Sequence, residues 1–546
     1  MGFQVVLLSG KVASGKSTLV QQLTRRFPDE RIHVLKTKDL IQELAKRRPT
    51  DTLRAERRAM QDFGDQLDRE TEGKWVRDGL VTLINQHMTL EASPIFIVDA
   101  VRILPQVRAI REAYGFSVIH IHLNAPEAEL EERYKSRSSG LKELKSYKEV
   151  EKNPTESRIG GLERSADVVV NTHACSPEDV LVRAATHLGL FTREYARLVD
   201  VIVGGQYGSE GKGHIASYLS REYGVLVRVG GPNAGHKVVL ADGPYTHHQL
   251  PSGTLRNPGA KLIIAPGAVV NPELLLKEAR ECKVDYQRLS IDPQTMVITE
   301  GDRKREAGLQ QRISSTGQGV GFATARRILD RGKRVLLAQD IRELKPFIRD
   351  TWELLEQSYR LGERVLVEGT QGAGLSLFHG YYPYVTSRDT NASGCLSEAG
   401  VSATRVRKTI MVCRTYPIRV QNPPGGTSGP LQHELSWEEV AKRAEVPVEE
   451  IKTNERTSTT NRERRVGGFD WILLRKSAAL NGPTDIAVTF TDYLNPLNAE
   501  ARRYEQLSAE TIRFIEEIER VGAAPVSLIS TRFDFRSIID RRRWRL

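Results

Sequence analysis

Cysteine is scarce in this sequence, and long apolar runs are missing. No CxxC pair occurs among the four cysteines, which are Cys175, Cys282, Cys395 and Cys413. Their spacing argues against a disulfide framework or a cysteine zinc site and favours a reducing, cytoplasmic location. No stretch approaches the ~18 apolar residues that a membrane span needs, and the N-terminal "FQVVLLSGK" has neither a charged leader nor a cleavage site. We therefore expect no membrane association and no signal peptide.

Acidic residues are outnumbered, since 80 lysines and arginines stand against 69 aspartates and glutamates, a formal net charge of +11. The positive charge is spread along the chain, apart from the tail "RRRWRL" at residues 541–546. No RNA-recognition or zinc-finger pattern accompanies it. A dispersed positive balance favours an enzyme of phosphorylated, acidic substrates over a specific nucleic-acid partner. Nucleic-acid binding through charge alone is the alternative.

Short runs rich in valine and isoleucine recur along the first 190 residues, among them "QVVLLSG", "IFIVDA" and "SVIHIHL". Amphipathic segments such as "STLVQQLTRRF" separate these runs, a rhythm that predicts a parallel sheet covered by helices. A second such region begins near Leu198 and includes "VDVIVGG", "VLVRVGG", "RVLVEG" and "DIAVTF". The predicted fold is α/β, with domains over residues 1–190 and 198–546. The polar stretch 140–161 is expected to be a loop.

A phosphate-binding motif follows the first predicted strand. The segment "GKVASGKS" at residues 10–17 fits G-x-x-x-x-G-K-[ST] and opens the predicted helix "KSTLVQQL", which is the context that the motif requires. Backbone amides of such a loop surround a phosphate, the lysine reaches the β- and γ-phosphates, and the serine hydroxyl binds Mg²⁺. The nucleotide-binding residues predicted here are Gly10, Gly15, Lys16, Ser17 and Thr18, with Ser17 also a metal ligand. The first domain is therefore predicted to be of the P-loop NTPase type.

Asp99 ends the predicted strand "PIFIVDA", where a carboxylate that orients Mg²⁺ belongs in such folds. The segment "VDAVRILPQVRAIREAYG" resembles the small nucleoside and deoxynucleoside monophosphate kinases. That resemblance implies that Arg102 grips the acceptor nucleotide. It also implies that Arg133 and Arg137, which share a helix face at i,i+4, lie in a lid over the transferred phosphoryl group. A solvated helix face is the alternative for these two arginines, and the acceptor is left open.

The second region begins with another glycine-rich loop, "GGQYGSEGKGH" at residues 204–214, whose glycine spacing is too short for the first motif. It resembles the GxQWGDEGKGK loop of adenylosuccinate synthetases. Six further segments resemble loops of that family in the same order: "VGGPNAGHKV", "SSTGQGVG", "VEGTQGAGLSLFHGYYPYVTS", "GTSGPLQHEL", "TSTTNRERRVGGFDW" and "VTFTDYL". The region over 198–546 is identified as a compact member similar to the archaeal and phage types. The resemblance implies an adenylosuccinate synthetase-type α/β domain and a homodimer with shared sites.

The resemblance also implies a reaction. The family joins L-aspartate to C6 of a 6-oxopurine nucleoside monophosphate, after ATP or GTP with Mg²⁺ has phosphorylated O6. Such chemistry needs a preorganised phosphate cradle and donors for the growing charge. The catalytic residues implied are His236, a general acid, together with Ser209, Lys212 and Gln371. Gly235 offers its carbonyl to Mg²⁺, and the triphosphate lies on Gly211, Lys212 and Gly213.

Several further residues are implied to bind the substrates. Asn233 and Gln371 contact the purine nucleotide, and Thr316 and Thr386 bind its 5′-phosphate. The resemblance implies that Thr460 and Arg462 bind the aspartate carboxylate, for which a guanidinium fork is well suited. The remaining candidates are Arg464 on the triphosphate, Asp492 on the base of the nucleoside triphosphate, and Arg326 or Arg327 as the arginine that a neighbouring subunit contributes.

Ser209 stands where the family has the aspartate of GDEGK, which removes the N1 proton of the purine and helps to bind Mg²⁺. A serine hydroxyl is not ionised near neutral pH and cannot replace a carboxylate base. One interpretation is a changed substrate, because a small neutral side chain leaves room for a 2-amino group and phage-type relatives that use dGMP carry a small residue here. IMP as substrate and an inactive nucleotide sensor are the alternatives. Phe490 replaces the lysine of TKxD, which leaves ATP and GTP both open, and His214 replaces a lysine.

Overall fold

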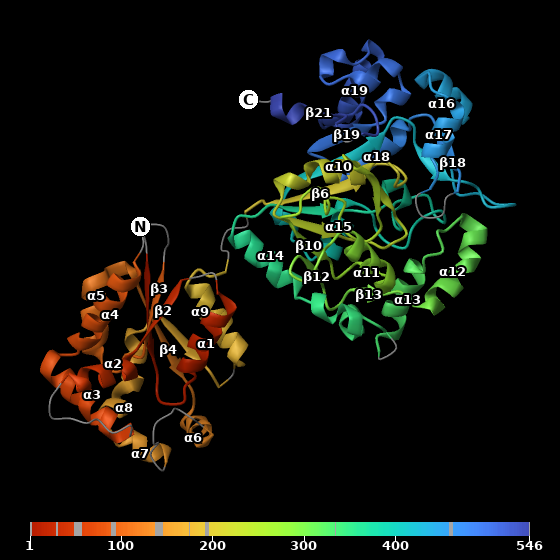
Figure 1. The fold of residues 1–546 in the computed structure, drawn as a ribbon. Helices are drawn as coiled ribbons and strands as arrows, with labels where there is room; N and C mark the ends of the chain where they lie inside the picture. Colours follow the sequence, from red (N-terminus) through yellow and green to blue (C-terminus); the bar gives the residue numbers. More distant parts are fainter. Residues whose placement is uncertain are drawn as a thin grey trace. The chain divides into compact units, whose positions relative to one another are not determined.

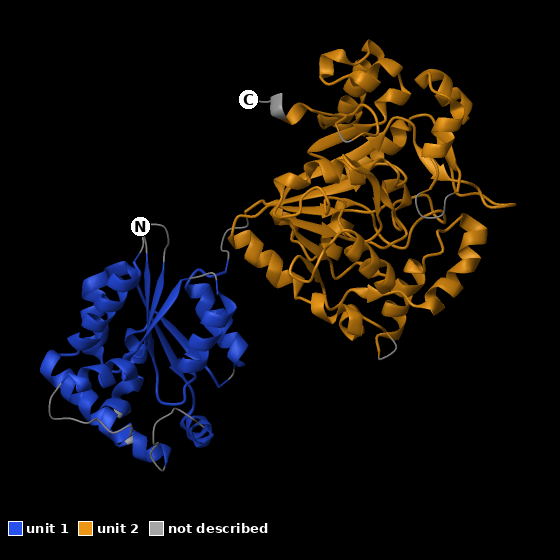
Figure 2. Ribbon diagram, viewed as in Figure 1, with its two compact units in different colours: residues 1–193 blue, residues 194–546 orange. Residues whose placement is uncertain are grey.

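The computed structural model describes most of the chain in ten stretches: residues 3–28, 31–47, 57–88, 94–136, 146–173, 175–191, 196–332, 335–457, 462–534 and 536–544. The chain divides into two compact units, Met1–Arg193 and Glu194–Leu546 (Figure 2). Within these stretches, no helix is both long and apolar enough to cross a membrane.

Unit 1 is built on a five-stranded parallel sheet in the order β2-β3-β1-β4-β5. Its strands are β1 (Gln4–Ser9), β2 (Ile32–Lys36), β3 (Ile95–Asp99), β4 (Val118–Asn124) and β5 (Val168–Asn171). The longer helices are α1 (Lys16–Arg26), α2 (Thr37–Lys46), α3 (Arg57–Thr71), α4 (Lys74–His87), α5 (Leu104–Tyr114), α6 (Glu127–Lys135) and α9 (Pro177–His187).

Successive residues of β1 point to opposite faces of this sheet, and both faces are covered. Val5 and Leu7 pack in a cluster with residues of α2, α3, α4 and α5, whereas Val6 and Leu8 pack with residues of α1 and α9. Figure 1 shows α4 and α5 on one side of the strands and α1 and α9 on the other. Burial on both faces explains why the strand sequences are apolar without alternation.

The expected loop over residues 140–161 is wrong for the part that the structure describes. Residues Tyr147–Glu151 form α7 and Pro154–Arg158 form α8, followed by a 3-10 helix over Ile159–Ser165. The Ser146 hydroxyl caps α7 by accepting a hydrogen bond from the amide of Glu149. Tyr147 and Val150 are buried against α6. Two apolar anchors and the caps thus hold a polar stretch in helical form.

Unit 2 is built on a nine-stranded sheet in the order β12-β10-β7-β14-β6-β15-β19-β20-β21, in which only the last pair is antiparallel among the described strands. The strands are β6 (Val199–Gly204), β7 (Val225–Arg228), β10 (Lys261–Ile264), β12 (Leu289–Ile291), β14 (Val365–Glu368), β15 (Val406–Arg414), β19 (Asp485–Thr489), β20 (Val526–Ser530) and β21 (Ile538–Asp540). The helices that matter for the site are α10 (Lys212–Leu219), α11 (Pro272–Glu281), α12 (Glu300–Ile313), α13 (Val320–Asp330), α15 (Ala392–Ala399), α17 (Val448–Asn454) and α18 (Trp471–Asn481). A hairpin of β8 (His236–Leu240) and β9 (Gly243–His247) and a small sheet that includes β18 (Arg464–Gly467) carry further site residues.

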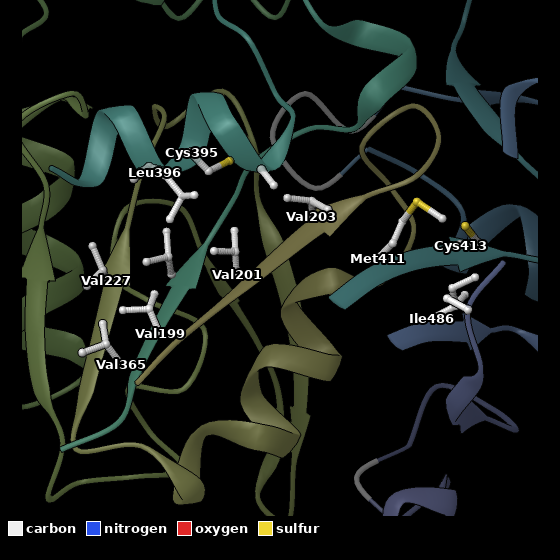
Figure 3. Close-up of a cluster of buried hydrophobic side chains, with 14 of the residues drawn as sticks. Val199, Val201, Val203, Val227, Val365, Cys395, Leu396, Met411, Cys413 and Ile486 are labelled. Atoms are coloured by element: carbon white, nitrogen blue, oxygen red, sulfur yellow. The ribbon is translucent and has the colours of Figure 1, made fainter. Parts of the chain in front are cut away.

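The middle strand of this sheet, β6, is buried on both faces. Val199, Val201 and Val203 belong to one cluster, and Figure 3 shows Cys395 and Leu396 of α15 directed toward these valines. Ile202 faces the opposite cluster, which includes residues of α10 and α11. The two phosphate loops thus share a position, because β1 and β6 are each the middle strand of their sheet. A loop at the carboxyl end of a central parallel strand is a common ligand site in α/β folds.

Candidate functional sites

The first phosphate loop connects β1 to α1, as the motif requires. Gly15 caps the helix with φ +94°, a left-handed conformation that glycine adopts without strain. The Lys16 ammonium donates hydrogen bonds to the carbonyls of Gly10 at 2.7 Å and Lys11 at 2.9 Å, and to the Ser14 hydroxyl at 3.2 Å. The lysine therefore lies over the loop, and its contact with a phosphate stays a prediction.

A cleft of about 1170 Å³ opens beside this loop. It exceeds the range of roughly 300–1,000 Å³ typical of a pocket for one small ligand, so it has room for a donor and an acceptor. The predicted residues that line it are Gly15, Lys16, Ser17, Thr18, Asp99, Arg102 and Arg133. Gly10, the first residue of the loop, is not among the residues that line the cleft, and an added Cβ there would come within 2.2 Å of the Leu123 carbonyl oxygen. Arg137 lies outside the described residues.

The two described arginines of unit 1 are held by different partners. Arg102 forms an ion pair with Glu156 of α8, the helix that replaces the expected loop. Arg133 donates hydrogen bonds to the hydroxyl and carbonyl oxygens of Thr172, each at 2.9 Å. The solvated helix face considered for Arg133 therefore does not describe it, although a contact with the transferred phosphoryl group stays a prediction.

Two residues of α3 line the same cleft and were missed in the sequence. Gln61 is buried, and its amide nitrogen has no hydrogen-bond partner within the described stretches. Asp68 accepts hydrogen bonds from the Trp75 indole at 2.7 Å and from the Gln106 amide at 2.8 Å, and burial raises the pKa of its carboxyl. No motif marks these positions. Only their spacing of seven residues, which places both on one helix face, could have paired them.

The second phosphate loop, between β6 and α10, is organised around Glu210. This carboxylate is fully buried and accepts hydrogen bonds from the amides of Gln206 at 3.0 Å and Gly208 at 2.7 Å. The Lys212 ammonium, on a side chain 1% exposed, donates to Glu210 at 2.6 Å and to the Gly208 carbonyl at 2.9 Å. Lys212 therefore holds the loop together from inside, and its contact with a triphosphate stays a prediction.

We expect Lys212→Met to destabilise the protein by about 3–5 kcal/mol, because it leaves the Glu210 carboxylate buried without its cation. The double variant Lys212→Met/Glu210→Gln should recover part of this loss, since the buried charge is then removed as well. Urea unfolding of the full chain measures both effects. A single variant as stable as the wild type would contradict the bracing role.

His236 lies against the first turn of α10. A Cβ placed on Gly213 would approach the His236 Cβ to 2.6 Å, so only glycine lets the ring come this close. The ring nitrogen Nδ1 contacts Glu368 of β14 and lies 2.6 Å from Arg228 Nη1 of β7. Burial, followed by the Arg228 charge, lowers the pKa of His236 to about 3. The family motif thus brings a neutral histidine to the start of the helix that follows the phosphate loop.

The residues implied to hold the purine nucleotide lie close together. The Gln371 amide donates to Asn233 Oδ1 at 3.0 Å, and the Cα of Gln371 lies 3.0 Å from a Cβ built on Gly208. These two contacts join the loop after β14 to the loop after β7 and to the second phosphate loop.

The two threonines implied to bind the 5′-phosphate lie on adjoining segments. Thr316 belongs to the loop that precedes α13, and Thr386 is followed directly by Ser387. A Cβ built on Gly321 of α13 would lie 3.4 Å from the Ser387 Cβ, which is ordinary packing distance. The contact of either threonine with a phosphate stays a prediction.

A buried arginine that carries no family motif joins three parts of this site. Arg414, 1% exposed, donates to the Ser209 carbonyl at 3.2 Å and forms an ion pair with Glu455 at 2.7 Å. Its guanidinium lies 4.1 Å from the centre of the Phe490 ring. Glu455 also pairs with Arg464 at 3.2 Å. Arg414 and Glu455 therefore connect the second phosphate loop with Arg464 and with Phe490, which precedes the expected base-binding residue Asp492.

Ser209 itself is partly exposed, and its hydroxyl makes no hydrogen bond to any described residue. Arg462 lies in the aspartate loop, where its amide donates to the Thr457 hydroxyl at 2.8 Å, whereas Thr460 lies outside the described residues. Arg326 is engaged in an ion pair with Asp302 of α12 at 2.8 Å. Contacts of these residues with substrates or a second subunit stay predictions.

Asp492 follows β19, and its Oδ1 is buried without a hydrogen-bond partner among the described residues. Burial, the largest cause, and the Glu455 charge raise the pKa of this carboxyl to about 7, against the opposing charge of Arg414. The folded state therefore holds a proton that the unfolded chain releases at its ordinary pKa of about 3.9. Stability should fall as the pH rises from the unfolded to the folded pKa.

We expect Asp492→Asn to remove this dependence, because an amide does not titrate. The melting temperature of the wild type relative to the variant should fall by a few degrees between pH 5 and pH 8. Calorimetry of both proteins at these two pH values measures the difference. If the melting temperature of the wild type minus that of the variant stayed constant or grew with pH, Asp492 would not be the group that holds the proton.

Comparisons with known proteins agree with this geometry. The family model for adenylosuccinate synthetase matches residues 201–343 and 336–499, and a model for an AAA domain matches residues 6–156. Adenylosuccinate synthetase of Pyrococcus horikoshii is 38% identical over 351 residues, which are 63% of this chain and 98% of the relative. That of Methanocaldococcus jannaschii is 40% identical over 353 residues, 63% and 96% of the two chains.

A solved structure of succinoaminodeoxyadenylate synthetase from cyanophage S-2L, bound to dGMP and to dATP as an energy donor, is also similar. It has a TM-score of 0.53 and 28% identity, and the match covers 63% of this chain and 96% of that one. The fully ligated adenylosuccinate synthetase of Plasmodium falciparum shares the fold, with a TM-score of 0.55. Since the family model spans most of unit 2 and the relatives match over nearly their whole length, the chain is a ligase that belongs to the adenylosuccinate synthetase family and carries an N-terminal P-loop domain that matches the AAA model.

Proposed function

We propose that unit 2 condenses L-aspartate with C6 of GMP or dGMP and forms 2-amino-adenylosuccinate or its deoxy form. The γ-phosphoryl group of ATP or GTP passes to O6 as the N1 proton is transferred to water beside the partly exposed Ser209. The aspartate amine then displaces phosphate and loses a proton to solvent. The products are the succinylated nucleotide, nucleoside diphosphate and phosphate. The side chain at position 209 carries this proposal.

Two properties of Ser209 support a 2-aminopurine. Its hydroxyl is small, partly exposed and without a described hydrogen-bond partner, so it leaves space beside the purine. Glu210 does not supply the missing base, because its carboxylate is buried and committed to two amides and Lys212. The similarity to the cyanophage enzyme bound to dGMP points the same way.

The metal sites fit Mg²⁺ unequally. In unit 1, Ser17 and Asp99 line one cleft and offer a hydroxyl and a carboxylate oxygen, which suit this hard cation. In unit 2, Gly235 offers a carbonyl, but Ser209 stands where the family has an aspartate, so the loop lacks that carboxylate ligand. Bound Mg²⁺ would neutralise charge on the transferred phosphoryl group in both units. In unit 2 it would depend more on the phosphates of the nucleotide for its ligands.

The four-nucleotide assay tests the ligase. Purified full-length protein is given Mg²⁺, aspartate and ATP or GTP with IMP, dIMP, GMP or dGMP, and phosphate release is followed with the mass of the nucleotide product. GMP or dGMP should give the highest kcat/KM. Preference for IMP would instead support a standard adenylosuccinate synthetase. The similarity to the two archaeal adenylosuccinate synthetases supports this alternative. No release with any of the four would favour the nucleotide sensor.

We propose in addition that unit 1 is a nucleotide kinase for a purine (deoxy)nucleoside monophosphate. The large cleft, Lys16 over its loop and Asp99 at the strand end support this proposal. A panel of nucleoside monophosphates with ATP tests it through formation of diphosphates. Transfer to pyrimidine nucleotides only, or to none, would contradict it.

A further inference from the structure

The neighbours of His236 Nδ1 raise a question about its proton. Glu368 Oε1 is the nearest polar atom, Arg228 Nη1 lies at 2.6 Å, and the Ser252 hydroxyl lies at 3.4 Å. An ionised carboxylate only accepts hydrogen bonds, and a guanidinium only donates them. If Glu368 accepts, Nδ1 carries the proton and Nε2 is bare. If Arg228 donates to Nδ1, the proton sits on Nε2.

The other contacts of these side chains decide between the two forms. Arg228 has further acceptors for its hydrogens: Glu368 Oε1 at 2.7 Å, the Ala234 carbonyl at 3.2 Å and the His248 carbonyl at 3.5 Å. Glu368 is 2% exposed, and the other partners of its carboxylate are all donors: Arg228, the Ser252 hydroxyl, and the Ser252 amide at 2.7 Å. A bare ring nitrogen in contact with this carboxylate would set lone pair against lone pair, so the Nδ1 proton lies between them.

Resting on the ligase function proposed above, we propose that Glu368 is a positioning residue that holds His236 in the Nδ1–H tautomer, with Nε2 as a hydrogen-bond acceptor at the phosphate loop. His236 Nε2 is buried and has no hydrogen-bond partner among the described residues. The Cβ and Cγ of His236 pack on Gly213, so the ring lies against the first turn of α10, the helix that follows the phosphate loop. Arg228 acts on Glu368, whose charge it balances in the interior.

This tautomer changes what the histidine does. A neutral ring with a bare Nε2 accepts a hydrogen bond at that atom and cannot donate one. The general-acid role that the family resemblance implies therefore requires the imidazolium form, which the Glu368 carboxylate stabilises through the same Nδ1–H bond. Proteins commonly fix the tautomer of a functional histidine through a carboxylate that accepts from its other ring nitrogen.

Nitrogen chemical shifts of histidine read the tautomer directly. The full chain, labelled with ¹⁵N-histidine, is examined by solid-state NMR, and the His236→Gln variant identifies the signals of this ring. We expect a protonated Nδ1 and an unprotonated Nε2 in the wild type. In Glu368→Gln the amide can donate to Nδ1, so the proton should move to Nε2. Protonated Nε2 in the wild type would overturn the proposal.

Kinetics separate positioning from mere structure. Glu368→Gln keeps the shape of the side chain, yet kcat for phosphate release should fall by at least about 100-fold, with the KM for the nucleoside triphosphate changed by less than about threefold. Glu368→Asp should restore part of kcat. Unchanged kcat in Glu368→Gln would overturn the proposal. Because the NMR signal needs no turnover, it distinguishes a wrong tautomer from a wrong substrate.

The chain offers a matched control in Glu278 of α11. Its carboxylate contacts His247 Nδ1 of β9 at 3.1 Å, and both side chains are buried. Glu278→Gln makes the same change in the same kind of pair on the neighbouring strand, where His247 is the cross-strand partner of His236. It therefore perturbs the same hairpin without touching His236 Nδ1. It should lower the melting temperature and leave kcat within about twofold of the wild type. Equal losses of kcat in both variants would mean that general destabilisation explains the effect.

Discussion

The Ser209→Asp variant is expected to change the ratio of kcat/KM for IMP to that for dGMP by about 10³-fold in favour of IMP. A general base contributes about 10²–10⁴-fold, so restoring the carboxylate should speed the loss of the N1 proton from IMP. The same carboxylate occupies the space that we assign to the 2-amino group of dGMP and should slow that reaction. The four-nucleotide assay, repeated with this variant, measures the ratio.

Ser209→Asn is the matched control, because asparagine has the size of aspartate without its charge. It should slow the reaction of dGMP through crowding and give no gain with IMP, since an amide is no base near neutral pH. If Ser209→Asp left the preference unchanged, the substrate would not depend on this residue. If both variants gained activity with IMP, the size of the side chain at position 209, and not proton removal by a carboxylate, would explain the result.

Lys16→Met is expected to lower the nucleotide kinase activity by about 10³-fold and to leave the ligase unchanged. Loss of one preorganised donor to a developing charge costs about 10²–10³-fold, and the P-loop lysine also positions the β- and γ-phosphates. The reverse should hold for His236→Gln, in which the kinase is retained and the ligase is lost. Diphosphate formation and phosphate release, measured on the same preparations, give both activities.

The pair of variants is its own control, because each protein retains one working unit. The ligase assay supplies the nucleoside monophosphate and the triphosphate directly, so the ligase does not depend on a product of unit 1. Loss of both activities in Lys16→Met would therefore indicate that the variant misfolds, which the melting profile measures. A Lys16→Met protein with full kinase activity would contradict the proposed role of the first loop.

The sheet of each unit could be predicted because its strands are apolar on both faces. The runs around Val5 and Val201 form strands as expected, and each leads into its phosphate loop. The helices over 147–165 could not be predicted, since Tyr147 and Val150 are anchors within a polar stretch. Apolar periodicity needs more than two positions before it distinguishes a helix from a loop.

The chemistry of the second site was only partly accessible from the sequence. Motifs placed His236 and Gln371, because each lies in a short loop of characteristic residues. Nothing in the sequence pairs Arg414 with the Ser209 carbonyl or with Glu455. The first contact forms because β15, which Arg414 ends, lies beside β6, and the second brings in Glu455 from the end of α17. Long-range ion pairs depend on the order of the strands, and local sequence patterns do not determine that order.

The ion pair between Glu210 and Lys212 affects the entropy cost of binding a nucleotide. Its charges cancel inside the loop, and its hydrogen bonds are complete before any ligand arrives. The entropy of shaping this segment is therefore lost when the chain folds, and little of it is lost again at each binding event. We therefore expect the backbone amides at the start of α10 to contribute much of the attraction for a triphosphate, and these directional groups select the shape of the ligand as well as its charge.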